Sequence, residues 1–283
     1  MRPTFPILLT TTIAAGALAA PAVADTPLVS DPTVANVTAY GATAAWSRRA
    51  QDGTHHLVVR SGGVIADAPV PAAGQALDPD LGPTASNGRV IVYARDGDLY
   101  QYTVGDPGER RVTALSSRYR EGAPSFFKGA IAFARFNGPR PGLYLYRPGR
   151  GPAQRLSRRI PVETDVAASR VAWAYVDIGV ASIYQTTHKG EATRRVAHTT
   201  SRNVSLSSPI LSRFNVYWLR RRVGSDQSTA HRVGVNAHRG LSALRATRAL
   251  PGVATSFGGD TQPTLYANRS GIWRVDPHLR FAG

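Results

Sequence analysis

The chain contains no cysteine among its 283 residues. This absence excludes a disulfide framework, thiolate zinc sites, iron–sulfur clusters, a cysteine nucleophile and a bacterial lipid-anchor cysteine. Lysine and glutamate are also scarce: 32 of the 34 basic residues are arginine, and glutamate occurs four times. The formal net charge is +16 and hydrophobic residues make up 42% of the chain. Such a composition predicts a folded protein that is stabilised by its core alone.

Only one long apolar run is present, and it lies at the N-terminus. Arg2 precedes the apolar run 6–20, and Ala22-Val23-Ala24 is a small-x-small cleavage signature. The run is shorter than the ~20 residues of a membrane-spanning helix. We therefore predict a signal peptide over residues 1–24 and a mature chain of 25–283, with no transmembrane segment after cleavage. The expected location is outside the cytoplasm: extracellular, in the cell wall or periplasmic.

Short apolar segments that end in an aromatic residue recur along the whole chain. The closing aromatics are Trp46, Tyr93, Phe133, Trp173, Trp218 and Tyr266, which are 47, 40, 40, 45 and 48 residues apart. A second apolar segment follows each of them after a short polar break and keeps nearly the same period. Two markers with one period indicate an internal repeat of about 43 residues.

Each repeat unit has the composition of several short β-strands. The first segment is β-branched and aromatic, and the polar break contains turn residues such as Asp96-Gly97. A third apolar segment often follows, and a proline-containing segment usually opens the next unit. Three or four strands per unit of this length predict an all-β fold, a six-bladed β-propeller. A β-sandwich does not explain six copies at constant period, and a β-helix repeats at shorter periods.

Two local features bear on this architecture. The segment 241–250 has leucines at helical spacing, yet in repeat register it is the outer strand of the fifth unit, so both structures remain open. The sixth unit ends soon after residue 275, which leaves few residues for its own outer strand. We therefore predict that the mature N-terminal segment, about Pro27 to Pro32, packs beside the final unit and closes the ring.

The repeat resembles the TolB-type propellers, a branch of the WD-repeat-like family. The clearest matches are residues 86–93 followed by 98–100, and residues 130–134 followed by 142–144. The resemblance extends from about residue 30 to the C-terminus at the level of pattern. It implies a propeller fold and protein or ligand binding in the cell envelope, and it carries over no particular partner.

Candidate catalytic carboxylates are few. Segments that lead into the innermost strands would line the central channel of a propeller, and they contain Asp80, Asp165 and Asp260. Two carboxylates across a channel could serve a glycosidase or lyase, although the sequence fixes no distance between them. Aspartate beside proline or threonine is also ordinary turn chemistry.

Arginine pairs form the second candidate site. The residues of interest are Arg194, Arg195, Arg220, Arg221 and Arg222. On one rim they would attract an anionic envelope polymer, whereas scattered arginines would be solvated charges that protect strand edges. We expect no nucleic acid as a partner of an exported chain.

No metal or cofactor is expected. His55 and His56 are adjacent and would point to opposite faces of a strand, and Asp96-Gly97-Asp98 lacks the further ligands of a calcium loop. The leading hypothesis is a monomeric, non-enzymatic binding or scaffolding module of the cell envelope. The alternatives are a propeller glycosidase or lyase that uses channel carboxylates, and an anionic-polymer binder with arginine-rich rims.

Overall fold

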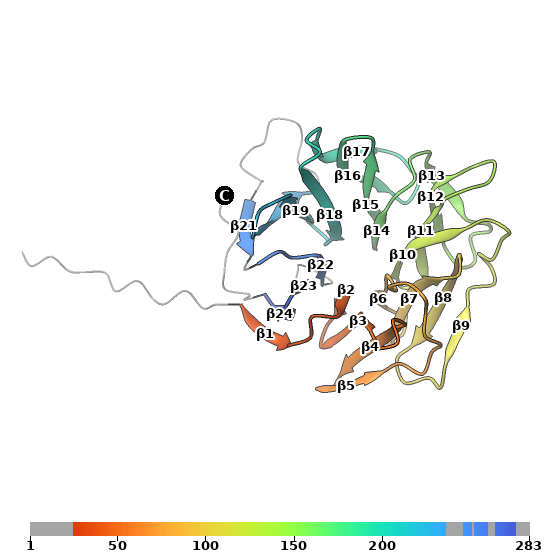
Figure 1. The fold of residues 1–283 in the computed structure, drawn as a ribbon. Coiled ribbons are helices and arrows are strands. Elements are labelled where there is room, and N and C mark those ends of the chain that lie inside the picture. The colour runs from red at the N-terminus through yellow and green to blue at the C-terminus, as the bar shows by residue number, and fades with distance from the viewer. Residues whose placement is uncertain (1–24, 236–245, 251, 260–263, 276–283) are drawn as a thin grey trace, which may run out of the picture.

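A computed structural model describes residues 25–235, 246–250, 252–259 and 264–275. Within these ranges the protein is built from 24 β-strands and contains no helix. The strands form six antiparallel sheets of four strands each. The sheets stand around a common axis, as in a six-bladed β-propeller (Figure 1), which confirms the predicted fold.

Each sheet is one blade, in which the strands follow one another from the axis outwards. Blades 1 to 3 consist of β2 (Val34–Tyr40), β3 (Thr43–Arg49), β4 (His55–Ser61) and β5 (Val64–Asp67); β6 (Asp80–Pro83), β7 (Arg89–Arg95), β8 (Asp98–Thr103) and β9 (Glu109–Arg111); and β10 (Glu121–Phe127), β11 (Ala130–Arg135), β12 (Gly142–Tyr146) and β13 (Gln154–Ser157). Blades 4 to 6 consist of β14 (Glu163–Ala167), β15 (Arg170–Asp177), β16 (Val180–Thr187) and β17 (Arg194–Thr199); β18 (Val204–Leu211), β19 (Asn215–Arg222), β20 (Ser228–Gly234) and β21 (Ala246–Leu250); and β22 (Ser256–Gly258), β23 (Leu265–Asn268), β24 (Gly271–Arg274) and β1 (Thr26–Val29).

The N-terminal strand closes the ring, as predicted. Strand β1 pairs antiparallel with β24, and Pro27 lies opposite Trp273. Blade 6 therefore takes three strands from the end of the chain and its outer strand from the beginning. Asp25, just before β1, forms an ion pair with Arg248 of blade 5, and both side chains are buried. This pair adds a second link at the point of closure.

The closing aromatics of the repeat occupy one equivalent position. All six lie on the second strand of their blades and are buried. In five blades the residue paired with the closing aromatic on the third strand also has a ring side chain, and the two rings stack. These pairs are Tyr93–Tyr100, Phe133–Tyr144, Trp173–Tyr184, Trp218–His231 and Tyr266–Trp273, with centroids 5.3–6.5 Å apart. The sequence period is thus the period of a buried aromatic on the second strand, which in five of the six blades stacks on the ring opposite it.

The hydrophobic core lies between neighbouring blades. Leu57 of blade 1 packs with Ile91 of blade 2 in one cluster, and Val92 of blade 2 packs with Phe133 of blade 3 in the next. Each sheet is therefore buried on both faces, which explains why the second strands are apolar at consecutive positions.

Close packing at the axis depends on glycine. A Cβ atom on Gly82 of β6 would collide with the backbone carbonyl of Phe126 in blade 3. A Cβ atom on Gly258 of β22 would lie 2.8 Å from the carbonyl carbon of Thr38 in blade 1. Glycine at these positions lets the inner strands of adjacent blades approach each other.

Two local expectations are also resolved. Residues 246–250 form strand β21, the outer strand of blade 5, while residues 241–245 lie outside the described ranges. Asp96 and Gly97 join β7 to β8 with φ angles of 54° and 85°, as a tight hairpin turn requires. The described part of the chain has no helix that is long and apolar enough to cross a membrane.

Candidate functional site

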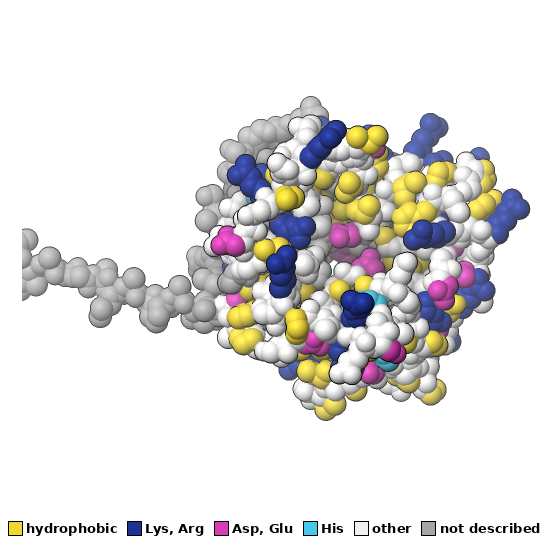
Figure 2. Space-filling view, in the orientation of Figure 1, with side chains coloured by type: hydrophobic (Ala, Val, Ile, Leu, Met, Phe, Trp, Pro, Cys, Tyr) yellow, Lys and Arg dark blue, Asp and Glu magenta, His cyan; other side chains and the backbone are white. Residues whose placement is uncertain are grey.

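The inner strands surround a narrow central channel. A cavity of about 70 Å³ is lined by residues from all six of these strands or the segments just before them. Four carboxylic acids lie in its wall, Asp78 and Asp80 from blade 2 and Glu163 and Asp165 from blade 4. We call them the channel acids. Figure 2 shows acidic side chains at the centre of the ring and lysine and arginine side chains around them.

Most of these acids bind the backbone of the next blade. Oδ2 of Asp80 accepts the N–H of Phe126 at 2.6 Å, and Oδ2 of Asp165 accepts the N–H of Leu211. Glu163 accepts the N–H of Ser208 through Oε2. Such bonds join neighbouring blades at the axis. They are needed there because, among the described residues, the strands of one blade do not pair with those of the next.

The same link is made by a neutral side chain elsewhere in the ring. Oγ1 of Thr38 in blade 1 accepts the N–H of Leu81 in blade 2 at 3.0 Å. Thr38, Asp80 and Asp165 occupy equivalent registers, because each lies opposite the residue just before the closing aromatic. The fold therefore needs an oxygen acceptor at this register to bond the next blade, and a hydroxyl group serves as well as a carboxylate.

Burial controls the ionisation of the channel acids. Burial raises the pKa of Asp78 to about 7, with Glu163 and Asp80 as secondary causes. It also raises the pKa of Glu163 to about 7 and that of Asp80 to about 6. The pKa of Asp165 is raised by burial and by the nearby charge of Asp80. No ion pair compensates these acids within the described part of the chain.

Two of the three carboxylates proposed from the sequence can be placed. Asp80 and Asp165 lie at the channel, and their charges interact. Asp260 lies outside the described residues. Each of the two placed carboxylates accepts a backbone N–H, which gives it a role in joining blades.

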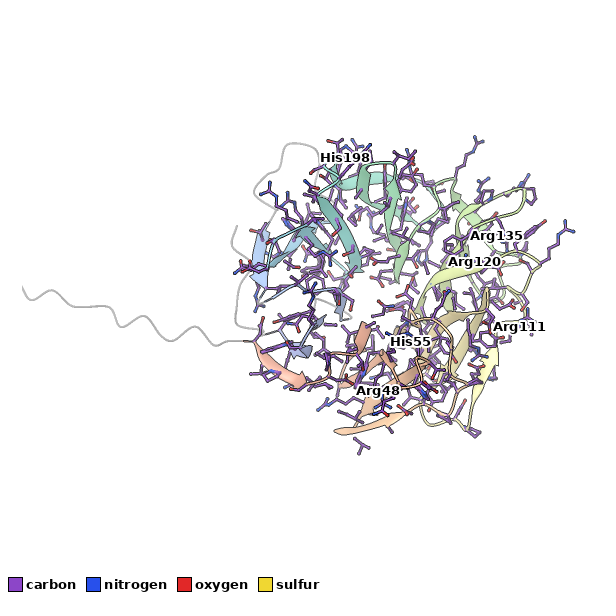
Figure 3. The ribbon with its side chains drawn as sticks, in the orientation of Figure 1. Arg48, His55, Arg111, Arg120, Arg135 and His198 are labelled. Atoms are coloured by element: carbon purple, nitrogen blue, oxygen red, sulfur yellow. The ribbon has the colours of Figure 1, made fainter. Side chains whose placement is uncertain are left out.

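A larger hollow opens beside the channel, between blades 2 and 3. Its volume is about 790 Å³, and we call it the side pocket. Its walls are the segment 73–78, the β7–β8 turn, the segment 117–123 and residues 136–137. Asp78 lines both this pocket and the channel, so the two hollows meet at that residue. Arg120, labelled in Figure 3, stands in the wall beside β10.

No sequence motif singles out the side pocket. Its walls come from segments up to about 60 residues apart, and the one recognisable pattern among them, Asp96-Gly97-Asp98, indicates a hairpin turn and not a ligand site. The strongest signal is Glu121, because glutamate is rare in this chain. Its side chain is only 1% exposed; Oε1 accepts a hydrogen bond from Ser117 at 2.6 Å and lies 3.0 Å from Nη2 of Arg135. Burial raises the pKa of Glu121.

The structure does not bring the five candidate arginines together. Arg194 and Arg195 begin β17, next to the hairpin between the third and fourth strands of blade 4. Arg220, Arg221 and Arg222 end β19, next to the hairpin between the second and third strands of blade 5. Those two kinds of hairpin lie at opposite ends of a blade, so the two groups face opposite ends of the ring.

Other arginines neutralise carboxylates within the blades. Figure 3 labels three of them, and their partners are Asp67 for Arg48, Asp98 for Arg111 and Glu121 for Arg135. Part of the positive charge is thus used inside the fold.

The described residues contain no cluster of histidine, aspartate or glutamate that could hold a metal ion. His55 and His56 contact different groups, since Nδ1 of His55 lies 3.4 Å from Oγ of Ser47 and Nδ1 of His56 lies 3.8 Å from Asp67. They do not converge on one point.

Comparison with protein-family models and with curated proteins gives no match. Solved structures do resemble this fold. TolB from Acinetobacter baumannii is 12% identical with a TM-score of 0.58, and the match covers 85% of this chain and 57% of TolB. An oligogalacturonate lyase in complex with manganese is 11% identical with a TM-score of 0.50, covering 88% of this chain and 80% of the lyase. The tricorn protease is 12% identical with a TM-score of 0.54, covering 87% of this chain and 25% of the protease.

This chain therefore spans little more than half the length of the TolB structure that it matches. At such low identities the likeness concerns the fold, which hosts both binding proteins and enzymes. On its blade count and strand pairing, the chain is a six-bladed β-propeller, and its fold resembles that of TolB.

Proposed function

We propose that this protein is an exported, non-enzymatic binding module, with residues 25–283 as one propeller domain. Its binding surface is the end of the ring where the segments between blades meet the hairpins between second and third strands. We call this end the connecting face; the side pocket opens on it. The observation that carries the proposal is that three of the four channel acids, Asp80, Glu163 and Asp165, accept backbone N–H groups.

A catalytic acid or base needs a carboxyl group that can reach substrate. Asp80 and Asp165 each bind the inner strand of the next blade, and so does Glu163. Removing any of these acceptors would leave a backbone N–H without its partner. Their position at the axis is explained by blade packing without a reaction.

The side pocket, in contrast, presents groups that the fold does not use. It is of the size of a ligand site, which commonly spans roughly 300–1,000 Å³. Arg118 and Arg120 in its wall are exposed, and Asp78 at its inner end makes no hydrogen bond or ion pair with a described residue. These groups are available to a ligand.

The test is a binding screen of the full-length protein, purified after export, against peptides, cell-wall fragments and anionic polysaccharides. The same ligands are assayed for turnover. We expect binding without turnover, and at least tenfold weaker binding for the double variant R118A/R120A. The matched control is K128A/K189A, because both lysines lie in hairpins at the opposite end of the ring. Equal loss in both variants, or binding of no ligand class, would contradict the proposal.

A second candidate function rests on Asp78 and Glu163. They face each other closely enough for their charges to interact, and each has a pKa raised to about 7. A carboxylic acid with a pKa near neutrality suits general acid–base chemistry, as in a glycosidase or lyase. Turnover of an oligosaccharide that D78N and E163Q each abolish, with the fold retained, would favour this function over binding alone.

Recognition of an anionic polymer through rim arginines is the remaining alternative. The separation of the two arginine groups to opposite ends of the ring weighs against one continuous basic rim. Binding to a polyanion that weakens steeply with salt and is lost in an R220A/R221A/R222A variant would support it.

A further inference from the structure

The side pocket has an acidic inner end. Asp78 lies there, where the pocket meets the channel, and the three other channel acids lie just beyond it. Asp78 accepts no hydrogen bond from a described residue and has no cation beside it in the described ranges. Its carboxylate is partly exposed and lines the pocket, so a donor group on a ligand can reach it and form a charge-assisted hydrogen bond.

Glu121 is a second acceptor in this wall without its full set of donors. Its Oε1 atom is engaged by Ser117 and Arg135, whereas its buried Oε2 atom has no hydrogen-bond partner in the described structure. The side chain is 99% buried. Two carboxylates of one pocket thus have oxygen atoms without a hydrogen-bond donor. This observation does not depend on the arginines at the mouth of the pocket.

The mouth of the pocket has the opposite charge. Arg118 and Arg120 are exposed, and neither forms an ion pair in the described structure. Each guanidinium group lies over a ring, Arg118 over Tyr119 at 5.3 Å and Arg120 over Phe136 at 5.2 Å. Nη2 of Arg118 also donates to the hydroxyl of Tyr119 at 3.2 Å. These contacts hold the guanidinium groups at the pocket while most of their N–H donors stay available to a ligand.

Resting on the proposed function, we propose that the side pocket binds a short free peptide by both of its termini. The peptide's ammonium group donates to the carboxylate of Asp78 at the inner end. Its carboxylate accepts hydrogen bonds from Arg118 and Arg120 at the mouth. A guanidinium fork matches a carboxylate in geometry and charge, and charge-assisted bonds of this kind are stronger than neutral ones.

Ligands of a single charge fit the pocket less well. A polyanion that entered from the mouth would meet Asp78 and the channel acids at the inner end. A simple cation would meet Arg118 and Arg120 first. Only a ligand with its positive group inside and its negative group outside satisfies both ends.

The experiment is calorimetric titration of the full-length exported protein with alanine peptides of two, four and six residues. Each peptide is used free, N-acetylated and C-amidated. We expect one length to bind best in the free form and either cap to weaken its binding at least tenfold. In D78N the N-acetyl cap should no longer matter, and in R118A/R120A the C-amide cap should no longer matter.

The matched control variants are D226N and R202A, which remove exposed charges near the connecting face at other blades. They should bind as the wild type does. A thermal melt of each variant establishes that it is folded. Equal affinity for free and capped peptides would overturn the proposal, as would loss of affinity in the variants without any change in the effect of a cap.

The two proposals fail differently. If another ligand binds the connecting face and no alanine peptide does, the binding function stands and recognition of peptide termini is wrong. If no ligand of any class binds this face, the proposed function itself is wrong.

Discussion

Oδ2 of Asp80 and the backbone nitrogen of Phe126 lie 2.6 Å apart across the boundary between blades 2 and 3. The bond ties two inner strands that share no sheet. Thr38 and Leu81 make the equivalent bond one boundary earlier with a hydroxyl group in place of the carboxylate. A residue that resembles a catalytic acid in the sequence is thus explained by the assembly of the ring.

We predict that D80A destabilises the protein by about 1–3 kcal/mol, the cost of a buried N–H that loses its acceptor. D80N should cost less than half as much, because the amide oxygen can still accept from Phe126. Denaturant unfolding of both variants measures the difference. Equal stability of D80A and the wild type would show that the bond is not needed.

Gly271 provides a test of ring closure. It has a φ angle of 134°, and a Cβ atom there would collide with the carbonyl oxygen of Val29 in β1. Gly63 also has a positive φ angle, 86°, but a Cβ atom there meets nothing within 4 Å. Both alanine substitutions introduce backbone strain of about 1–3 kcal/mol, and only G271A also pushes β1 away.

The thermal midpoint should therefore fall further in G271A than in G63A. For a domain of this size each kcal/mol lowers the midpoint by roughly 2–4 °C. Limited proteolysis should cut G271A near residues 26–29 and leave G63A intact there. An equal loss of stability in both variants would mean that strand β1 contributes little to closure.

The channel acids should make the protein less stable as the pH rises. The pKa of Asp78 is about 7 in the folded state and near its ordinary 3.8 in the unfolded chain. Between these values the folded state binds more protons than the unfolded state, so the free energy of unfolding falls with increasing pH. Glu163 and Asp80 act in the same direction.

Accordingly, D78N should raise the thermal midpoint at pH 8 and change it little at pH 4, where Asp78 is protonated in the folded state. Melting curves of the wild type and of D78N across this range measure the effect. The control is D177N, since Asp177 is exposed and its pKa is lowered by hydrogen bonds to Ile178 and Tyr175. A wild-type–D78N difference that does not vary with pH would contradict the assignment.

Export should produce a chain that begins at Asp25. The predicted cleavage follows Ala24, and strand β1 starts at Thr26. Mass spectrometry of the protein recovered outside the cytoplasm gives the mature N-terminus directly. A mature chain that begins beyond Val29 would lack β1, which would contradict both the cleavage prediction and this way of closing the ring.

Much of the fold was predictable because it repeats. The closing aromatics lie on the same strand of each blade since each must fill the same space between sheets, and that demand leaves a period in the sequence. Closure by the N-terminal strand was also predictable, because the sixth unit has too few residues for four strands. Segment 241–250 was ambiguous because its leucine and arginine spacing fits a helix as well as an outer strand, and residues 246–250 of it form the outer strand β21.

The candidate site was much less predictable. Glu121, Arg118 and Asp78 come from segments that meet only when blades 2 and 3 pack together. The placement of Arg194 and Arg220 at opposite ends of the ring follows from the antiparallel order of strands within a blade, which arginine spacing in the sequence does not report.

The sequence by itself determined the all-β class, the six-unit repeat and the closure, since these depend on short-range patterns of apolar and turn residues. Only the tertiary structure decided that three of the four channel acids bind backbone N–H groups. It also decided that a pocket with an acidic inner end and arginines at its mouth lies beside them. The physical reason is that hydrogen bonding, burial and charge compensation depend on which distant side chains the ring brings within a few ångströms of each other.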